Sequence, residues 1–570
     1  MGAFGTVTAL LAAMTVSLLS PAVVSAATFT IADGDVANLI TAVGTSGTNV
    51  INLAPGGTYT LSAANNGDPA TGGNGLPVIA SGSDLTINGN GATIQRGPGA
   101  PAFRIFRVSP NATLRLNAVV IRNGSIIGAV GTGGIAGLPG GNGFPGQNGS
   151  SGQDGLAAFG GGITNSGTLI VNGSTFTINT ATGGRGGQGG DGGSGGDSGN
   201  GGNGGNGGNG GSASGGAINT ASGGVTTLIN STVASSTATG GIGGIGGNGG
   251  NAARACSPFC TAHSGGNGGR GGDGGTGDGG AVTVINTTIA TNTASTTQGG
   301  PGGLGGRGAG LTDGTDGSFG ASGTAQGGGL ANSGIATVTN ALLANNVGGA
   351  HANCFGALTD NGHNLEFNPP NTCGFTNAAQ TGDPVLGALA SNGGPTPTMA
   401  LGSGSAAMGV GNSSVCAAAF PTGAGAVDQR GYPRPTMCSI GAYEGGLTIS
   451  GISVPSGSIT GGVRIMLIGQ GFLTGATVSF GGSAATVTSV SATTIVVKTP
   501  SHGPGTVPIT VTNPDTNAVT MPGAYTFGVV NAIPGPQPTH PISGGTTPLP
   551  APRPSDPPSG NPSPLPPPRP

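Results

Sequence analysis

The sequence has few charges and no tryptophan. Only 6% of its 570 residues are charged, and the formal net charge at pH 7 is −3. This balance gives no electrostatic basis for binding nucleic acid or an anionic membrane. Beyond the N-terminal region no run reaches the ~18 apolar residues of a membrane span, so we expect no integral membrane span in the mature chain.

Helical periodicity is also scarce, whereas glycine, with 128 residues, is too abundant for an ordinary globular protein. Short segments nevertheless alternate Val, Ile, Leu, Phe and Thr with small polar residues over four to six positions. Such alternation is typical of β-strands and supplies the core that a disordered chain would lack.

One segment, Gly160–Gly184, has four close variants elsewhere in the chain. The asparagines that begin the five copies lie 55, 58, 56 and 54 residues apart, a fixed period that indicates a solenoid. We predict an all-β fold, a right-handed parallel β-helix, whose copies share one inward ladder of apolar residues and one corner of asparagines. The predicted ladder and corner pairs are Asn117 with Val120, Asn172 with Phe176, Asn230 with Val233, Asn286 with Ile289, and Asn340 with Leu343.

Residues 1–26 resemble an export signal. Val7 to Val24 is apolar, and Val24-Ser25-Ala26 fits a small-residue cleavage site, although no Lys or Arg precedes the apolar run. An apolar first strand, or a start codon placed too late, are the alternatives. Six cysteines, an even number, suit an oxidising compartment, so we expect a secreted or cell-envelope protein.

Residues 28–127 form the predicted entry to the solenoid. A short amphipathic helix over residues 35–43, capped by Asp33 or Asp35, is expected to cover the open end of the β-helix. Five arginines gather after it, and they fit either an anionic glycan site or solvated rung edges. They are Arg96, Arg104, Arg107, Arg115 and Arg122.

Two parts of the chain resemble a known group of proteins. The runs FTIADGDVANLITAV, LTINGNGATI and FRIFRV are similar to the amino-terminal half of large exported bacterial β-helix proteins, many of which end in a choice-of-anchor Q domain. Residues 350–445 carry closing motifs like theirs: GHNL at 362–365, DPVL at 383–386, NGGPTPT at 392–398, DQRG at 428–431 and CSIGAYE at 438–444. Ser439 departs from the usual Asp, and residues 405–409 depart from the usual Ser-Pro-Ala-Ile-Asp. The resemblance implies a β-helix over residues 27–446 and a surface or secreted setting, not an activity.

Glycine-rich insertions at about 128–159, 185–214, 242–278 and 301–326 leave the rungs at one point and should project from one side. Their unit is Gly-Gly-X, and they resemble the glycine-rich repeats of mycobacterial PE-PGRS surface proteins, without a preceding PE domain. Packed polyglycine helices with three residues per turn and flexible coil both fit this period. The GGxGxD matches at 186–191, 192–197 and 268–273 lack the apolar residue of a calcium-binding repeat, so we expect no metal and no cofactor.

The cysteines form three local couples: Cys256 with Cys260, Cys354 with Cys373, and Cys416 with Cys438. We predict a disulfide in each, although six cysteines allow fifteen connectivities. Cys256, Cys260 and His263 have zinc-like spacing, but no fourth ligand is near.

Residues 447–528 contain short alternating strands separated by turns, which predicts an immunoglobulin-like sandwich. The motifs GQGF at 469–472, FGG at 480–482 and AYTF at 524–527 resemble the IPT/TIG family. Arg464 and Lys498 provide no basic face for nucleic acid. The Pro-rich residues 529–570 predict a disordered tail.

Catalytic groups are scarce in the solenoid. The later rungs, 160–184, 215–241, 279–300 and 327–349, contain no charged residue and no histidine, whereas acid–base catalysis needs a titratable group at the reacting atoms. The candidates that remain are Asp360, His363, Glu366 and Arg107. We therefore expect a non-catalytic, monomeric surface or matrix protein with an adhesin-like role and a host or matrix glycan or protein as partner. The alternative is a glycan-active β-helix, a polysaccharide lyase or hydrolase.

Overall fold

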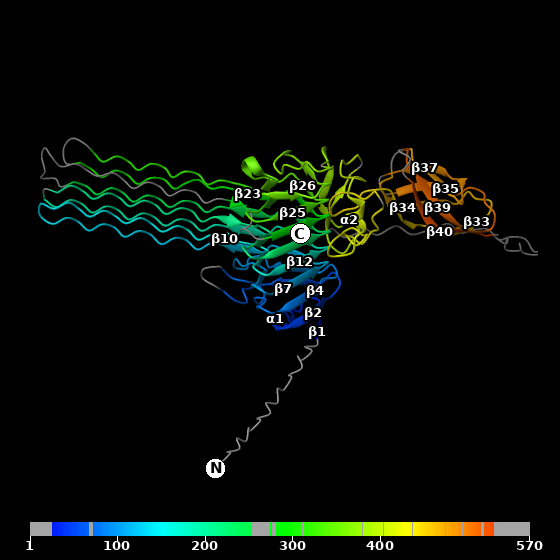
Figure 1. The fold of residues 1–570 in the computed structure, drawn as a ribbon, viewed down its shortest axis with the longest axis horizontal. Coiled ribbons are helices and arrows are strands. Elements are labelled where there is room, and N and C mark those ends of the chain that lie inside the picture. The colour runs from blue at the N-terminus through cyan, green and yellow to red at the C-terminus, as the bar shows by residue number, and fades with distance from the viewer. Residues whose placement is uncertain are drawn as a thin grey trace, which may run out of the picture.

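The computed structural model describes residues 26–528 except 68–71, 198, 253–273, 276–280, 309–312, 379, 403, 436, 473–474, 492–493 and 515–517. Nearly all of the predicted signal peptide, the predicted Cys256–Cys260 disulfide and the predicted Pro-rich tail lie outside the described residues. Figure 1 shows a stack of strands with a long arm on one side and a β-sandwich on the other. The fold is all-β with a parallel solenoid, which confirms the predicted fold class.

The largest sheet of the solenoid stacks nine parallel strands. In each strand alternate side chains are buried, as Leu169 and Val171 are, because successive residues of a strand face opposite sides of the sheet. The strands are β1 (Ala27–Ile31), β2 (Thr48–Leu53), β4 (Asp84–Asn88), β7 (Thr113–Asn117), β12 (Thr168–Asn172), β17 (Val225–Ile229), β21 (Ala281–Ile285), β25 (Ala336–Thr339) and β28 (Leu358–Asp360).

The other walls of the solenoid are one long parallel sheet and four short ones. The long sheet contains β3 (Thr58–Leu61), β5 (Thr93–Arg96), β8 (Val120–Arg122), β13 (Thr175–Thr177), β18 (Thr232–Ala234), β22 (Thr288–Ala290), β26 (Leu342–Ala344) and β29 (Leu365–Phe367). The short sheets contain β9 (Ser125–Ile127), β14 (Thr180–Thr182), β19 (Thr237–Thr239) and β23 (Thr293–Ser295); β10 (Ala158–Phe159), β15 (Ala213–Ser214) and β20 (Gly274–Gly275); β6 (Phe106–Val108), β11 (Ile163–Asn165) and β16 (Ile218–Thr220); and β24 (Leu330–Ala331) and β27 (Cys354–Phe355).

Helix α1 (Val36–Val43) covers the first rung. Asp35 caps it by accepting a hydrogen bond from Asn38 N (3.1 Å), and the helix buries Leu39 and Val43. It contacts β1 and β3, the first strands of the two long sheets. The helix therefore shields the apolar end of the stack, as its sequence pattern predicts.

The apolar ladder has the expected members in four of five rungs. Strand pairing aligns Phe176, Val233, Ile289 and Leu343 in one column, and all four are buried. In the preceding rung, however, the residue that pairs with Phe176 is Ile121, and Val120 pairs with Thr175. The prediction of Val120 in this ladder is wrong by one residue.

The single corner predicted for the asparagines is also wrong, because the asparagines occupy two positions. Asn117 and Asn172 pair at the last position of their strands, and Asn172 pairs with Ile229 in the next rung. The later three occupy the turn that follows, in the left-handed backbone region that asparagine tolerates. Their φ angles are 45° for Asn230, 44° for Asn286 and 50° for Asn340.

A second polar column runs inside the solenoid. Asn179 N donates to Ser236 Oγ (3.3 Å), Ser236 N donates to Asn292 Oδ1 (3.0 Å), and Asn292 N donates to Asn346 Oδ1 (2.9 Å). All four side chains are buried. The column satisfies backbone groups at a corner that strand pairing leaves free.

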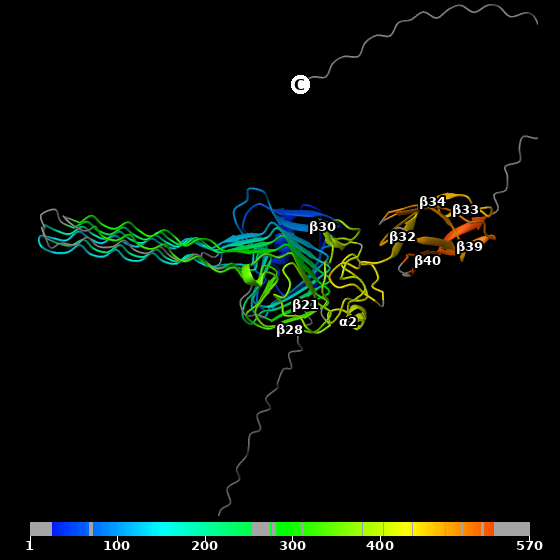
Figure 2. The same ribbon diagram turned by 90° about the horizontal axis from the view of Figure 1, so that it is seen from above.

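The glycine-rich insertions form the arm, whose legs run side by side in both views (Figure 1, Figure 2). Seven legs lie within the described residues: 128–141, 144–157, 183–196, 199–212, 240–252, 298–308 and 313–324. Backbone hydrogen bonds join neighbouring legs at every third residue, for example from Gly131 N to Arg185 O (2.8 Å) and from Gly134 N to Gln188 O (2.7 Å). Where the structure describes them, the insertions are thus an ordered bundle rather than coil, with the three-residue repeat of a polyproline-type helix.

A closing segment after β29 folds back along the solenoid. It contains the antiparallel pair β30 (Leu386–Ala390) and β31 (Thr398–Leu401) and the short helix α2 (Ser413–Ala417); a 3-10 turn, Gly349–His351, precedes β27. Disulfides join Cys354 to Cys373 and Cys416 to Cys438, as predicted. The second disulfide lies against two corner asparagines, since Asn286 Nδ2 and Asn340 Nδ2 both contact Cys416 Sγ.

The remaining strands form a two-sheet sandwich around its own core, where Phe480, Tyr525 and Phe527 meet edge to face. One sheet contains β32 (Thr448–Ile452), β34 (Arg464–Gln470), β38 (Thr494–Lys498) and β37 (Thr486–Val490). The other contains β33 (Ser456–Ser458), β40 (Ala518–Gly528), β39 (Gly505–Thr512), β35 (Thr477–Phe480) and β36 (Ser483–Ala484).

Candidate functional site

The four candidate catalytic residues do not form one site. Asp360 ends β28, His363 lies in the turn that follows and Glu366 lies in β29, all at the last rung. Arg107 lies in β6, in a different sheet and several rungs away. The structure thus separates Arg107 from the two carboxylates.

Asp360 is occupied in holding a loop. Its carboxylate accepts hydrogen bonds from the backbone N–H groups of Thr376, Asn377 and Gly362 and from Asn364 Nδ2, at 2.7–3.0 Å. Burial alone would raise the pKa of Asp360, but these bonds, led by those from Asn377 and Thr376, lower it. A carboxylate stabilised in its charged form is a poor general base.

Glu366 and His363 have similar structural contacts. Glu366 accepts hydrogen bonds from Thr372 N (2.7 Å) and Cys373 N (2.9 Å), beside the Cys354–Cys373 disulfide. His363 Nδ1 lies 2.8 Å from Val410 O in the closing segment. These groups close a loop over the last rung and therefore act as part of its end.

Four of the five clustered arginines do not share a surface either. Arg104 is buried and donates to Asn74 Oδ1 (2.9 Å), Arg96 donates to Asn123 O (2.9 Å), and Arg115 pairs with Asp84. Arg122 is exposed and lines a groove of about 600 Å³ between β8 and the residues around Pro395. Among the described residues of that groove it is the charged one, so the groove offers a cation without a carboxylate partner.

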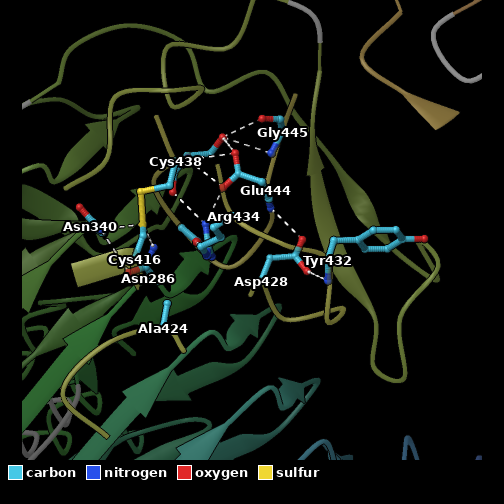
Figure 3. Close-up of polar contacts among 12 residues, drawn as sticks. Asn286, Asn340, Cys416, Ala424, Asp428, Tyr432, Arg434, Cys438, Glu444 and Gly445 are labelled. Atoms are coloured by element: carbon cyan, nitrogen blue, oxygen red, sulfur yellow. Dashed lines mark hydrogen bonds and ion pairs between the residues drawn. A yellow bond between two sulfur atoms is a disulfide. The ribbon is translucent and has the colours of Figure 1, made fainter. Parts of the chain in front are cut away.

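A buried ionic cluster fixes the closing segment (Figure 3). Arg430 Nη2 lies 2.7 Å from Asp428 Oδ2, and Arg434 Nη1 lies 3.0 Å from Glu444 Oε2. Ser439, the residue that departs from the resembled motif, donates from its Oγ to Glu444 Oε1 (2.6 Å). Burial raises the pKa of Glu444 and lowers that of Arg434, against the attraction between the two groups. These charges are paired with one another and enclosed, so they are not exposed to a substrate.

Gln429 joins this cluster to the solenoid. Its Oε1 accepts from Thr232 Oγ1 (2.6 Å), and its Nε2 donates to Thr175 Oγ1 (2.8 Å) and Thr396 Oγ1 (2.9 Å). Arg434 Nη2 also donates to Asn230 Oδ1 (3.2 Å) at the corner of a rung. The DQRG motif therefore attaches the closing segment to the wall of the β-helix, a role that its residue types alone do not indicate.

The interior of the arm excludes every side chain. A Cβ atom on Gly187 would lie 2.0 Å from Thr132 O, and one on Gly190 would lie 2.1 Å from Ile135 O. On Gly205 it would lie 2.0 Å from Ser150 O. Such separations are impossible between real atoms, so the legs approach one another backbone to backbone and only glycine fits.

Glycine content follows the position of a leg in the bundle. Leg 183–196 bonds to four other legs, 128–141, 144–157, 199–212 and 240–252, and has glycine at two of every three positions. Leg 128–141 bonds, among the described residues, to 183–196 and 144–157, and larger residues fill most of its other two positions. Of these two legs, the Gly-Gly-X leg has four bonded neighbours and the Gly-X-X leg has two among the described residues.

The X positions carry the outward side chains, and several bond the next leg. Asp191 Oδ1 accepts from Asn248 N (2.7 Å), and Asn248 Oδ1 accepts from Leu304 N (2.9 Å). Asn148 Oδ1 accepts likewise from Asn203 N (2.7 Å). These contacts explain why Asn and Asp are frequent at X. Their side-chain oxygens accept hydrogen bonds from backbone N–H groups at X positions of the next leg, which the bonds between glycines do not satisfy.

Large apolar side chains are exposed on leg 128–141 and at the start of leg 144–157. Val130 is 65% exposed, Ile135 79%, Leu138 64% and Phe144 68%. Other legs expose Ile242, Leu304 and Phe319. The arm therefore presents several large apolar side chains to solvent away from the solenoid, and we treat it as the candidate functional site.

Comparison with known protein families identifies one domain of the chain. The IPT/TIG domain family matches residues 447–527, the β-sandwich. Comparison with curated proteins finds no match. Two structures of the Plexin A4 extracellular region align at 18% identity and a TM-score of 0.14; each alignment covers 15% of this chain and 9% or 8% of the plexin chain. Within the described residues, no helix is long and apolar enough to cross a membrane.

Proposed function

We propose that the chain is a non-catalytic secreted or cell-surface protein of a bacterium, with an adhesin-like or matrix-forming role. The observation that carries this proposal is the arm, a hydrogen-bonded bundle that projects side chains away from the solenoid. At roughly 3.1 Å per residue, a leg of the length of 128–141 extends on the order of 40 Å. Such a rigid projection is suited to contact a surface, not to enclose a substrate.

Three features support an exported setting. The N-terminal segment resembles an export signal, two disulfides join segments of the closing region, and an IPT/TIG domain follows. The resemblance of residues 350–445 to choice-of-anchor Q domains, and of the insertions to PGRS repeats, points the same way. IPT/TIG domains often mediate protein binding, so the partner can be a host or matrix protein or glycan.

The glycan-active alternative has weaker support. Asp360 and Glu366 are engaged with loop backbone, and Arg107 lies several rungs away. The groove beside Arg122 favours binding of a glycan rather than its cleavage.

Fractionation of cells, envelope and medium, combined with a turnover assay, tests the proposal. We expect the protein in the envelope or medium, and no unsaturated product or new reducing end from anionic and neutral polysaccharides. Binding of immobilised matrix components should fall when Ile135, Leu138 and Phe144 are replaced together by serine. Polysaccharide turnover that Asp360→Ala or Arg107→Ala abolishes would establish the enzyme instead.

A further inference from the structure

The outer face of one sandwich sheet carries an apolar patch at its centre. On β34 the outward side chains of Met466 and Ile468 are 37% and 42% exposed, and Val496 of β38 lies opposite Met466 in the strand register. β34 and β38 are the two central strands of this sheet. Outward positions of a sandwich sheet are normally polar, because water covers that face. Three apolar side chains side by side at the centre of the face therefore depart from the usual pattern.

Two cations flank this patch. Arg464 and Lys498 pair directly opposite each other on β34 and β38, and both are exposed. Like charges at directly opposite positions of two strands repel one another. The described residues of the sandwich include no Asp or Glu, so no carboxylate described in this domain neutralises the pair. The two cations and the three apolar side chains are called the sandwich face below.

Leg 313–324 of the arm presents the complementary groups. Glycine recurs at every third residue of this leg, and all of its other residues are exposed. Residues three apart lie on one side of a helix with three residues per turn, so Asp313, Asp316 and Phe319 form a single stripe. Phe319 is 78% exposed. Oδ1 of each carboxylate accepts a hydrogen bond from the backbone of leg 298–308 (2.8 Å), which holds both acidic side chains in place on the bundle.

The spacings of the two surfaces agree. Along the leg, at about 3.1 Å per residue, Phe319 lies about 9 Å from Asp316. Along β34, at about 3.3 Å per residue, Met466 lies about 7 Å and Ile468 about 13 Å from Arg464. A leg that places a carboxylate at the two cations therefore brings Phe319 over the apolar patch.

The two surfaces of one molecule are not placed to meet each other. The arm and the sandwich project from opposite sides of the solenoid (Figure 1). The arm of one copy can, however, reach the sandwich of another. A contact between two different surfaces leaves one free surface of each kind on the resulting pair, so further copies can add to it.

We propose that the sandwich face binds leg 313–324 of a second copy, so that the chain assembles head to tail. The two carboxylates of the leg meet the two cations of the face, and Phe319 covers the apolar patch. The contact is small and belongs to the weak class of interfaces, so the expected monomer is the form of dilute solution. The inference deepens the matrix-forming role proposed above and rests on it for its biological setting. Self-association tests the inference, whereas cell fractionation and matrix binding test that role.

Sedimentation velocity of the purified full chain tests the proposal over about 1 to 500 μM protein, a range that covers weak specific affinities. We expect the average mass to rise with concentration in low salt and to fall in about 0.5 M NaCl, because salt screens exposed charge pairs. A chain that stays monomeric at every concentration in low salt overturns the proposal. Association that salt does not weaken overturns it too, because such a contact would not depend on these charges.

Two double variants assign the surfaces. Arg464→Glu with Lys498→Glu removes the sandwich face and keeps the leg. Asp313→Asn with Asp316→Asn removes the charges of the leg and keeps an amide oxygen for each backbone hydrogen bond. Each variant alone should associate about tenfold or more weakly than the parent chain, since each loses the charge complementarity of the contact. An equal mixture should form a one-to-one dimer that does not grow, because each variant supplies the surface that the other lacks. Parent-like association of either variant, or a mixture that stays monomeric, contradicts the proposal.

A single substitution tests the apolar part of the contact. Phe319→Ser should weaken association about fivefold or more, because it removes the apolar area that the contact buries. The matched control is Ile335→Ser, in the turn before β25, where Ile335 is 70% exposed and belongs to neither surface. Its association should equal that of the parent chain. Equal weakening by the two serine variants contradicts the proposal.

Discussion

The rungs and the legs stack the same repeat in opposite ways. In both, backbone groups pair with the copy about 55 residues away: Phe176 aligns with Val233 in the rungs, and Gly186 N bonds to Ile242 O in the arm. The rungs bury side chains inside the coil, whereas the legs leave no room for side chains in the interior of the bundle. One chain thus builds a solenoid whose core requires side chains and a bundle whose interior excludes them.

The difference shows what a period can encode. A rung is stabilised by apolar burial, so its sequence alternates and its strands pair at strand spacing. In the interior of the bundle a leg buries peptide groups, so glycine is needed wherever a Cβ atom would meet the backbone of another leg. The two regions should therefore be destabilised by opposite substitutions. A rung is destabilised when a buried side chain is removed or replaced by a charged one, and a leg is destabilised when a side chain replaces an interior glycine.

The strongest test of the rungs is Phe176→Asp. Phe176 is fully buried in the ladder, so an unpaired carboxylate there should cost at least about 4 kcal/mol and unfold the solenoid. Ile178→Asp, two residues on and 44% exposed, is the matched control and should change little. Thermal unfolding of both proteins measures the difference. An unchanged melting temperature in Phe176→Asp would contradict the ladder.

In the legs the corresponding test adds a side chain. Gly190→Val should open the arm locally, because its Cβ would lie 2.1 Å from Ile135 O, and should leave the melting of the rungs nearly unchanged. Hydrogen exchange by mass spectrometry should show lost protection in leg 183–196 and in the legs that bond to it, and no loss in the strands of the rungs. Gln188→Val, at an exposed X position two residues earlier, should keep that protection. Equal loss of protection in the two variants would mean that the close approach of the legs is not the reason for glycine at position 190.

The loop of residues 360–377, at the last rung, differs from both regions because a charged side chain stabilises it. The pKa of Asp360 is lowered by its hydrogen bonds, so the carboxylate contributes stability above its unfolded pKa and loses it as the pH falls through the lower folded value. We expect the loop of residues 360–377 to loosen in acid while the charge-free rungs stay paired. Asp360→Asn should loosen it already at pH 7, as hydrogen exchange against pH can show. Acid loosening of the rungs first would reverse this order.

Particular residues show how far the sequence leads. The fold class can be predicted from the repeat period and from the alternation of apolar and polar residues. The pairing of Phe176 with Ile121 cannot be predicted in this way. Asn117 and Asn172 end strands whereas Asn230 lies in the following turn, and this shift by one residue is hidden because all three residues are asparagine. The contact of Gln429 with Ser174 spans 255 residues, and no spacing predicts it. The Gly-X-X pattern of leg 128–141 is visible in the sequence, but only the packing of the legs explains why that leg has less glycine than leg 183–196.

The smallest expected effect separates the two kinds of contact within the arm. Asp191 Oδ1 accepts from Asn248 N on the neighbouring leg at an exposed position, and such bonds contribute about 1 kcal/mol or less. Asp191→Ala should therefore leave both the rungs and the glycine network intact and raise exchange at Asn248 alone. Gln188→Ala is the control, since its side chain makes no such bond among the described residues. If Asp191→Ala instead opened the whole leg, the X side chains and not the glycine contacts would hold the arm together.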